Sequence, residues 1–463
     1  MVSFFCLRFS NAISSLKIFF DVLVRFIQGG HILNYLNLSK EKLKEIEFDL
    51  KKEYEKLKAL NLKLDMSRGK PSPEQTELSL GLLDTVKSND NLISESGIDC
   101  KNYGTLDGLP EMKKIFSEIL EIGENNIIIG GNSSLSLMFD AISYFMTHGV
   151  LGSKPWASYQ NDSKNIKFLC PSPGYDRHFA ILDFFNIEPI VIPMLKTGPD
   201  MDLIEKLISE DETIKGIWCV PKYSNPQGIT YSDETVKRFS KLKPKAFDFR
   251  ISWDNAYAIH DLSDTPDKLS NLMEHCKKNH TENLPLMFCS TSKITFPGAG
   301  VAAIGASDDN INYIKKMYSF KTIGYDKINQ LRHIRYFKTF ENIKLHMEKH
   351  KSILKPKFDI VLNALENNFF DNKIVSWETP KGGYFISIDV AKGCAKNTVR
   401  LCKNLGLILT PAGSTFPKKL DPNDSNIRIA PSYPSLEELK KAMDVLCLCI
   451  KLAFCEKILS ENM

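Results

Sequence analysis

The sequence lacks the features that mark several large classes of protein. Its 463 residues contain no C-x-x-C pair, and the 11 cysteines are odd in number and scattered, so neither a zinc centre nor a disulfide framework is indicated. Lys and Arg (60) nearly balance Asp and Glu (56), and the net charge of +4 is too small to indicate nucleic acid or an anionic membrane as a partner. These absences favour a small-molecule ligand and reduced thiols, as in the cytoplasm.

The first 30 residues also lack a membrane span. They are rich in Phe, Ser and Leu, but Arg8, Lys17, Asp21 and Arg25 keep every apolar run below the about 18 residues that a span needs. The composition fits a mitochondrial presequence or an extension that the fold does not need. The expected location is therefore the cytoplasm, or mitochondria if this segment is a presequence.

What the sequence does contain is an alternation of short apolar runs with longer amphipathic stretches. Hydrophobic residues make up 43% and charged residues 25%, which is typical of a globular protein, and the length allows two to three domains. Strands separated by helices predict an α/β fold with a mostly parallel sheet covered on both faces. We predict an amphipathic helix over residues 38–60 and strands over 126–129, 166–170, 216–220, 247–253 and 286–289.

The pattern changes after about residue 338. A long charged helical stretch is followed by a turn at residues 380–383, a strand at 384–388 and a terminal helix after Ser435, which predicts a smaller α+β domain. The expected boundaries are an N-terminal extension over 1–35, a helix and strip of the small domain over 36–77, a large domain over 78–340 and the small domain over 341–463.

Polar residues follow several of the apolar runs, where ligands bind in an open α/β sheet. Run 126–129 leads into Gly131-Asn132-Ser133 and a helix, whose free N–H groups suit a phosphate, although a plain capped helix has the same pattern. Run 166–170 leads into a proline-rich turn that carries Tyr175 and His178.

Three further run ends carry polar or reactive groups. Asn225 precedes Pro226 in an Asn-Pro-x-Gly loop, which is also a common turn. Asp254 follows a buried run, where a carboxylate needs a cationic partner or serves as a helix cap. Lys293 lies just outside run 286–289, where a desolvated amine can react with a carbonyl group; read alone, it would be a surface lysine.

Nine segments occur in the order in which one enzyme family has them: LDMSRGKPSPEQ, YGTLDGLPEM, PSPGYDRHF, NPQG, WDNAY, STSKITFPGAG, GYDKINQLRH, PKGGYF and NIRIAPS. From about Leu64 to Leu446 the chain resembles the class I aminotransferases of fold type I, which use pyridoxal 5′-phosphate (PLP), and among them the divergent aspartate aminotransferase-like subgroup named class Ic. The resemblance implies a large domain with a seven-stranded, mostly parallel sheet between helices, and a smaller α+β domain.

The resemblance assigns four residues to the ring and reactive carbon of PLP. Lys293 corresponds to the lysine that holds PLP covalently and moves the substrate proton, and Asp254 to the carboxylate that pairs with the pyridine nitrogen. His178 matches the residue that orients this carboxylate, and Tyr175 the aromatic side chain stacked on the pyridine ring.

Other residues correspond to further cofactor and substrate contacts. Asn225 and Tyr257 match the pair that binds the phenolic oxygen of PLP, and Asn225 also faces the substrate. Arg428 has the position of the arginine that binds the substrate α-carboxylate, and Gly69 belongs to the strip that closes over it. The residues assigned to the phosphate are Gly131, Asn132, Ser133, Ser290 and, from a neighbouring subunit, Tyr103, which implies a homodimer with shared active sites.

The chain departs from the class I pattern at one place. Class I enzymes have an arginine for the phosphate shortly after the lysine, and residues 296–301 contain none, a gap that the subgroup shares. The candidates to replace it are Lys321, Lys327 and Arg332, and those for a distal substrate carboxylate are Arg68, Lys70 and Lys321.

The resemblance therefore implies a transaminase (EC 2.6.1) that moves the amino group of L-aspartate, or a similar amino acid, to 2-oxoglutarate by a ping-pong mechanism. No metal, nucleic acid or membrane partner is expected. Another amino-donor specificity or a β-lyase activity at the same PLP site stays open. A third alternative is a non-catalytic PLP-sensing module, as in bacterial transcription regulators, although the roughly 60 residues before the fold do not form a basic DNA-binding domain.

Overall fold

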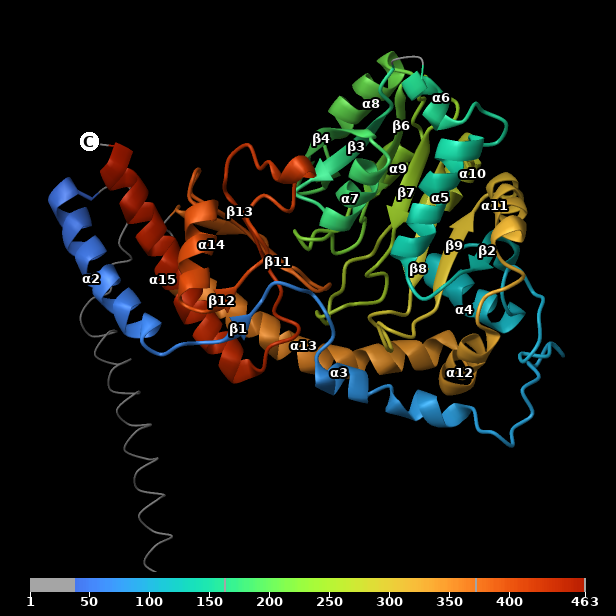
Figure 1. The fold of residues 1–463 in the computed structure, drawn as a ribbon, viewed down its shortest axis with the longest axis horizontal. Coiled ribbons are helices and arrows are strands. Elements are labelled where there is room, and N and C mark those ends of the chain that lie inside the picture. Colours follow the sequence, from blue (N-terminus) through green and yellow to red (C-terminus); the bar gives the residue numbers. More distant parts are fainter. Residues whose placement is uncertain (1–37, 162–163, 371–372, 462–463) are drawn as a thin grey trace, which may run out of the picture.

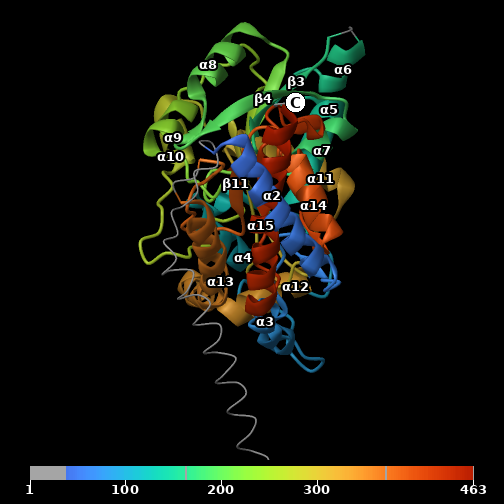
Figure 2. The same ribbon diagram turned by 90° about the vertical axis from the view of Figure 1, so that its left-hand side faces the viewer.

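The computed structural model describes residues 38–161, 164–370 and 373–461, so the predicted extension over 1–35 lies outside the described residues. Figure 1 shows a larger part built on a sheet and a smaller part, with the long helix α13 (Phe340–Phe369) running from one to the other. In Figure 1 and in the perpendicular view of Figure 2, helix α2 (Lys40–Lys58) lies along the last described helix, α15 (Leu436–Glu461).

The larger part contains an eight-stranded sheet in the order β2-β9-β8-β7-β6-β3-β4-β5. The five strands from β8 to β4 pair in parallel, whereas β9, β2 and β5 each run antiparallel to their neighbour. The strands are β2 (Ile127–Ile129), β3 (Lys167–Ser172), β4 (Glu188–Leu195), β5 (Gly198–Pro199), β6 (Ile214–Cys219), β7 (Arg250–Asp254), β8 (Pro285–Ser290) and β9 (Ala302–Ala306).

The sheet has one strand more than the seven that the resemblance implied. The extra strand, β5, is only two residues long and pairs with the end of β4, with Leu195 opposite Gly198. Gly198 has a φ of 128°, a backbone conformation that glycine adopts readily, and this permits the tight return. Because β5 contains no apolar run, a search for such runs does not reveal it.

Helices cover both faces of the sheet, as the alternation of runs predicted. Along β8, Met287 and Cys289 face one core while Leu286 and Phe288 face the other, the period of two that a strand imposes. The first core contains residues of α4 (Pro110–Leu120), α8 (Met201–Glu210), α9 (Asp233–Phe239), α10 (Leu272–Asn279) and α12 (Lys327–Phe337), and the second those of α5 (Ser134–His148), α6 (Trp156–Asn161), α7 (Asp176–Phe184) and α11 (Asp308–Lys321).

The smaller part has a core of its own, shared by the two chain regions that precede and follow the large sheet. Ser39 caps the predicted first helix by accepting a hydrogen bond from the backbone N–H of Lys42 at 3.3 Å. The further elements are β1 (Leu64–Asp65), which pairs with β12 (Leu407–Ile408), the sheet β10 (Val375–Trp377), β11 (Ile386–Val390) and β13 (Asn426–Ile429), and the helices α3 (Pro73–Glu77) and α14 (Ala395–Asn404).

Helix α13 belongs to both parts. Its first half contributes Ile343 and Met347 to a core of the large sheet, and its second half contributes Phe358 and Leu365 to the core of the smaller part. The border expected at residue 340 therefore falls where this shared helix begins, and the domain boundaries stay a prediction.

The ten cysteines within the described residues are free and buried. None of the helices in the described part of the chain combines the length and the apolar composition that a membrane span requires.

Candidate active site

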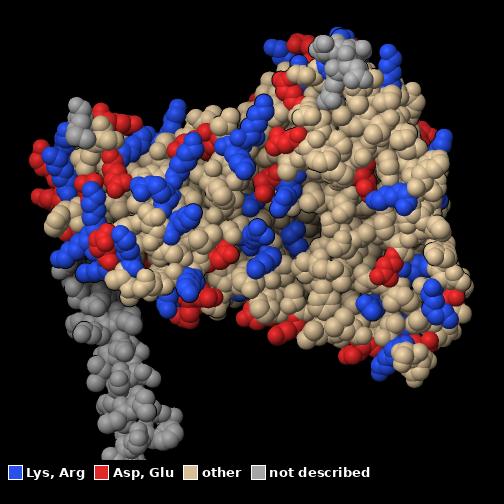
Figure 3. Space-filling model, in the orientation of Figure 1, with Lys and Arg blue, Asp and Glu red and all other residues tan. Residues whose placement is uncertain are grey.

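A cavity of about 630 Å³ lies where the carboxyl ends of the parallel strands meet the smaller part. Figure 3 shows a hollow near the middle of one face of the molecule, with Lys and Arg side chains beside it. The lining comes from strand ends of the large sheet, from the starts of α5 and α7, from the strip of residues 67–70 and from segments around β11, β12 and β13.

Lys293 lines this cavity one short turn after β8. Its Nζ lies 4.9 Å from the centroid of the Tyr257 ring, and its carbonyl accepts a hydrogen bond from the Tyr384 hydroxyl at 3.5 Å. Burial lowers the pKa of the Lys293 amine, and the nearby Asp254 and Cys289 oppose this effect. The neutral form of the amine, which can accept a proton or attack a carbonyl group, is therefore reached at a lower pH than in a surface lysine.

Asp254 is the last residue of β7, and only 3% of its surface is exposed. Its Oδ2 lies 3.2 Å from Nε2 of His178, whose ring stacks on Trp218 with centroids 4.5 Å apart. The other carboxylate oxygen, Oδ1, has no hydrogen-bond partner within the described residues. A buried carboxylate oxygen without a partner is costly, so it favours a cationic or N–H donor ligand in the cavity.

Three more side chains frame the space between Lys293 and Asp254. Tyr257 is buried, and burial raises the pKa of its hydroxyl well above the usual value. Tyr175 packs edge-on against His178, and burial, followed by the nearby Asp254, raises its pKa to about 12. Asn225 is buried beside a cis peptide bond to Pro226 and accepts a hydrogen bond from Arg428.

Arg428 projects from β13 of the smaller part and is 7% exposed. Its Nη1 donates to Oδ1 of Asp176 at 3.2 Å and to Oδ1 of Asn225 at 3.3 Å, while Nη2 donates to the Thr410 hydroxyl at 3.2 Å. The guanidinium carbon lies 4.8 Å from the centroid of the Phe385 ring. Its Nε is buried and has no partner among the described residues, so this N–H donor of the guanidinium is unpaired.

The family model "Aspartate amino-transferase" matches residues 38–462 of the chain, and this match decides the family. The chain belongs to the aspartate aminotransferase family. An aspartate aminotransferase of Corynebacterium glutamicum is 40% identical over 409 residues, which cover 88% of this chain and 93% of that protein. A Mycolicibacterium smegmatis protein named as an aminotransferase is 46% identical over 411 residues, 88% of this chain and 95% of its own.

Solved structures of aminotransferases agree with this assignment. The crystal structure of an aspartate transaminase from Corynebacterium glutamicum superposes with a TM-score of 0.89 at 39% identity, covering 92% of this chain and 99% of the other. An α-aminoadipate aminotransferase from Thermus thermophilus shares the fold, with a TM-score of 0.68 at 17% identity, over 86% of this chain and 93% of its own. The chain is therefore a transaminase of fold type I, EC class 2.6.1.

Most of the residues expected at the active site of this aminotransferase do come together. Nine of them line the cavity: Gly69, Ser133, Tyr175, Asn225, Asp254, Tyr257, Ser290, Lys293 and Arg428. His178 lies behind Asp254 rather than in the cavity wall. Gly131 and Asn132 are not part of the lining, although the Ser292 hydroxyl donates to the Asn132 carbonyl at 2.8 Å and so joins their loop to the lysine loop.

Tyr103 stands apart from the other expected residues. It lies on the surface of the described chain with 83% of its area exposed, and it is not part of the cavity lining. The role that the resemblance gives it requires a second subunit, so its contact with the phosphate stays a prediction.

The three cations suggested by the sequence for the phosphate do not line the cavity. Lys321 forms an ion pair with Asp140, and Lys327 donates to the Gly104 carbonyl at 3.1 Å. Arg332 lies on α12, with its Nε buried and without a partner in the described residues. The assignment of these three residues to the phosphate stays a prediction.

Among the polar residues of the cavity wall that sequence reasoning missed are Asp176, Arg177 and Thr410. Asp176 and Arg177 lie between Tyr175 and His178, inside a segment that was recognised, but only the aromatic residues were singled out. Their position in the first turn of a helix at a strand end was the available signal. Thr410 follows a two-residue strand and has no such signal in the sequence.

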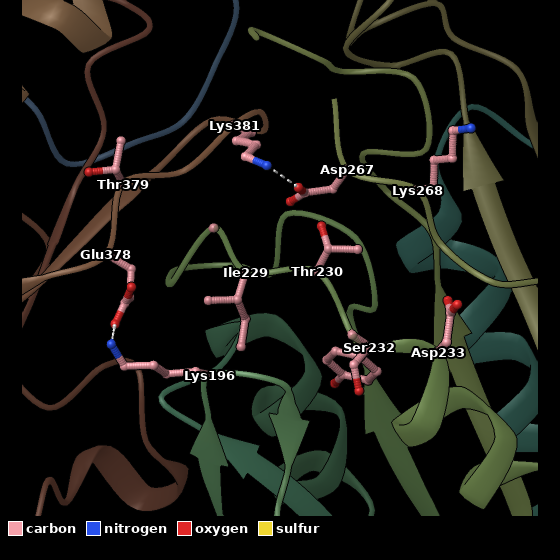
Figure 4. Close-up of a pocket in the computed structure, with 12 residues that line it drawn as sticks. Lys196, Ile229, Thr230, Ser232, Asp233, Asp267, Lys268, Glu378, Thr379 and Lys381 are labelled. Atoms are coloured by element: carbon pink, nitrogen blue, oxygen red, sulfur yellow. Dashed lines mark ion pairs between the residues drawn. The ribbon is translucent and has the colours of Figure 1, made fainter. Parts of the chain in front are cut away.

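A second hollow, of about 340 Å³, lies away from Lys293, between the β4–β5 turn and the loop before β11. Figure 4 shows two ion pairs across it, Lys196 with Glu378 and Lys381 with Asp267, at 2.8 and 3.1 Å. Its acids and lysines are paired or open to solvent, and none of the residues predicted for the aminotransferase site lines it.

Proposed function

We propose that this aminotransferase binds PLP in the cavity beside Lys293 and transfers the amino group of L-aspartate, or a similar amino acid, to 2-oxoglutarate in a ping-pong cycle. The observation that carries the proposal is the buried, unpartnered Oδ1 of Asp254, a strand-end residue that lines the same cavity as Lys293, whose pKa burial lowers. A protonated pyridine nitrogen supplies the donor that this oxygen lacks.

The residues present fit the other parts of the cofactor. Asn225 and Tyr257 would hold its phenolic oxygen and Tyr175 its ring face, while Ser133 and Ser290 would hold its phosphate. Ser133 begins α5, whose first N–H groups favour an anion. When bound, PLP supplies an electron sink for the charge that develops at the substrate Cα.

The side chains of this chain then divide the remaining work. Arg428 binds the α-carboxylate of the substrate through its planar fork of N–H donors. The Lys293 amine, whose pKa burial lowers, accepts the proton from the substrate Cα at Nζ in its deprotonated form. The strip at Gly69, which packs against the Phe385 ring, covers this region and excludes water.

The choice of a dicarboxylic substrate is supported by charge. Besides Lys293 and Arg428, the cavity is lined by Arg68, Lys70 and Arg177, so a second carboxylate finds cations within the same wall. The name of the Corynebacterium glutamicum relative, an aspartate aminotransferase, agrees with this choice. Another amino donor or a β-lyase outcome would use the same Lys293 and Arg428, and product analysis separates them.

The test is the visible absorption spectrum of the purified protein with PLP, before and after addition of L-aspartate. We expect a PLP band that L-aspartate removes and 2-oxoglutarate restores. The Lys293→Ala variant should show neither change, whereas Lys316→Ala, an exposed lysine on α11, should behave as the wild type. A band that ignores L-aspartate contradicts the substrate, and no band at all contradicts the cofactor.

We also propose that the enzyme is a homodimer in which Tyr103 of one subunit contacts the phosphate of the other. Tyr103 is 83% exposed in a single chain, which agrees with a residue that contacts a second subunit. Sedimentation should give twice the chain mass, and Tyr103→Phe should weaken PLP retention without altering that mass. A monomer with full activity would contradict this arrangement.

A further inference from the structure

Asp176 forms the only ion pair recorded for Arg428 within the described residues. The pair joins the large sheet, through the first residue of α7, to β13 of the smaller part. Arg428 is buried at 7% exposure, whereas the Asp176 side chain is 36% exposed. The carboxylate can therefore be reached from the cavity, while the guanidinium has little contact with solvent.

The charges around the cavity make this pair unusual. Besides Lys293, four cationic side chains line the wall, namely Arg68, Lys70, Arg177 and Arg428, against two acids, Asp176 and Asp254. Asp254 lies beside His178. Of these two acids of the cavity wall, Asp176 is therefore the one that forms an ion pair with the arginine proposed to bind the substrate. A buried arginine without a counter-ion would be costly, which gives the pair a structural reason as well.

The position of Asp176 is fixed by its local structure. It begins α7, where the free N–H groups of the helix start stabilise a carboxylate. Tyr175 before it packs edge-on against His178, and His178 lies two residues further along the same helix. The carboxylate is thus held at the arginine by the first turn of a helix rather than by a loop.

We propose that Asp176 determines ligand selectivity as an internal carboxylate, which occupies Arg428 until the α-carboxylate of the substrate displaces it. This inference rests on the proposed role of Arg428. A carboxylate that makes two parallel hydrogen bonds with the guanidinium replaces Asp176, whereas a small anion with one contact competes poorly. Because the amino acid and the oxo acid carry the same α-carboxylate, the exchange weakens the binding of both and raises KM more than it alters kcat.

The test compares the PLP-loaded wild type with Asp176→Asn, which keeps the size of the side chain and removes its charge. We expect KM for both substrates, and the dissociation constant of propionate measured by calorimetry, to fall by about 3- to 10-fold, with a smaller change in kcat. Inhibition by chloride should become stronger in the same variant. Asp183→Asn is the matched control, because it removes an exposed charge two turns along the same helix and should change none of these constants.

Two further variants keep the test decisive. Asp176→Glu retains the competing carboxylate and should keep KM closer to the wild-type value, and Asp176→Ser replaces the Asn variant if that protein does not fold. A higher KM, or a loss of kcat without a fall in the propionate dissociation constant, would overturn the inference. Propionate carries no amino group, so its binding reports on Arg428 even if L-aspartate is not the donor.

Discussion

At Lys293, burial and charge act on the amine in opposite directions. Burial lowers its pKa, while Asp254 and the Cys289 thiol raise it. The same Asp254 has one oxygen near His178 and one oxygen without a described partner. One carboxylate therefore affects both the basicity of the lysine and the affinity of the cavity for a cationic ring.

We expect Asp254→Asn to lower kcat/KM by about 10²–10³-fold, because the amide removes the charge that stabilises a protonated pyridine nitrogen. Steady-state kinetics of the PLP-loaded protein measure this loss. Asp84→Asn, which changes an exposed acid, should keep wild-type activity. A similar loss in both variants would show that the effect is unspecific.

Buried histidines near the lysine loop make the protein sensitive to acid. Burial lowers the pKa of His333 and of His350 from near 6.5 to about 4. Both are neutral above pH 6.5 in the folded and the unfolded chain. Between about pH 6.5 and 4 the unfolded chain binds protons that the folded chain does not. The free energy of unfolding therefore decreases as the pH is lowered, by at most roughly 3 kcal/mol for each histidine.

The measurement is the thermal midpoint at pH 7.5 and 5.0. His333→Gln removes the titrating ring that lies 3.1 Å from the Thr291 hydroxyl, so we expect a lower midpoint at pH 7.5 but a shallower decline towards pH 5.0. His148→Gln changes an exposed histidine at the end of α5 and should keep the wild-type slope. Equal slopes in all three proteins would show that His333 accepts its proton while folded.

At the scale of elements, the strip over residues 67–70 is connected to Arg428 by two contacts. The Thr410 hydroxyl donates to the Ser67 carbonyl at 2.7 Å and accepts from Arg428 at 3.2 Å. Gly69 lies against the Phe385 ring, and a Cβ at this position would overlap the ring that also contacts the guanidinium. The strip, β11 and β13 therefore share one packing arrangement around the arginine.

We expect Gly69→Ala to lower kcat/KM for both substrates by about 10- to 100-fold, since displacement of Phe385 shifts Arg428 from its position. The thermal midpoint should fall as well, because Phe385 is buried in the core of the smaller part. Gly298→Ala provides the comparison, as its added Cβ has nothing within 4 Å. An unaltered kcat/KM in Gly69→Ala would mean that the strip adapts without cost.

The elements that could be predicted from the sequence are those with a strong local pattern. The runs that became β3, β6 and β8 are continuous and apolar because both faces of these strands are buried. β4 escaped prediction, since it is half exposed and contains Pro189 and Pro193, and β9 because its residues are mostly small. Lys293 and Asp254 were found from a resemblance, whereas the pair of Asp176 and Arg428 joins residues 252 positions apart, which no local pattern reveals.

At the scale of the whole molecule, two ion pairs span the second hollow between the parts. Lys196 is 83% exposed and Glu378 47% exposed, so water screens their attraction. Exposed pairs of this kind contribute little to stability. Buried contacts, such as those along α13 and the pair of Asp176 and Arg428, therefore contribute more to holding the parts together.

We expect Glu378→Gln to move the thermal midpoint by no more than about 2 °C and to leave kcat and KM unchanged. Differential scanning calorimetry at low and high salt measures this. A shift of more than about 5 °C that disappears at high salt would show instead that the pair fastens the two parts.

The packing of α2 against α15 has a consequence for biosynthesis. Leu43 and Tyr54 of α2 belong to a core that is filled by residues of α15, the last helix described. At about 5–20 residues per second, the ribosome exposes α2 on the order of tens of seconds before its partner emerges. During this interval the apolar face of α2 is an open target for chaperones, and a stop codon before Leu436 would make that exposure permanent.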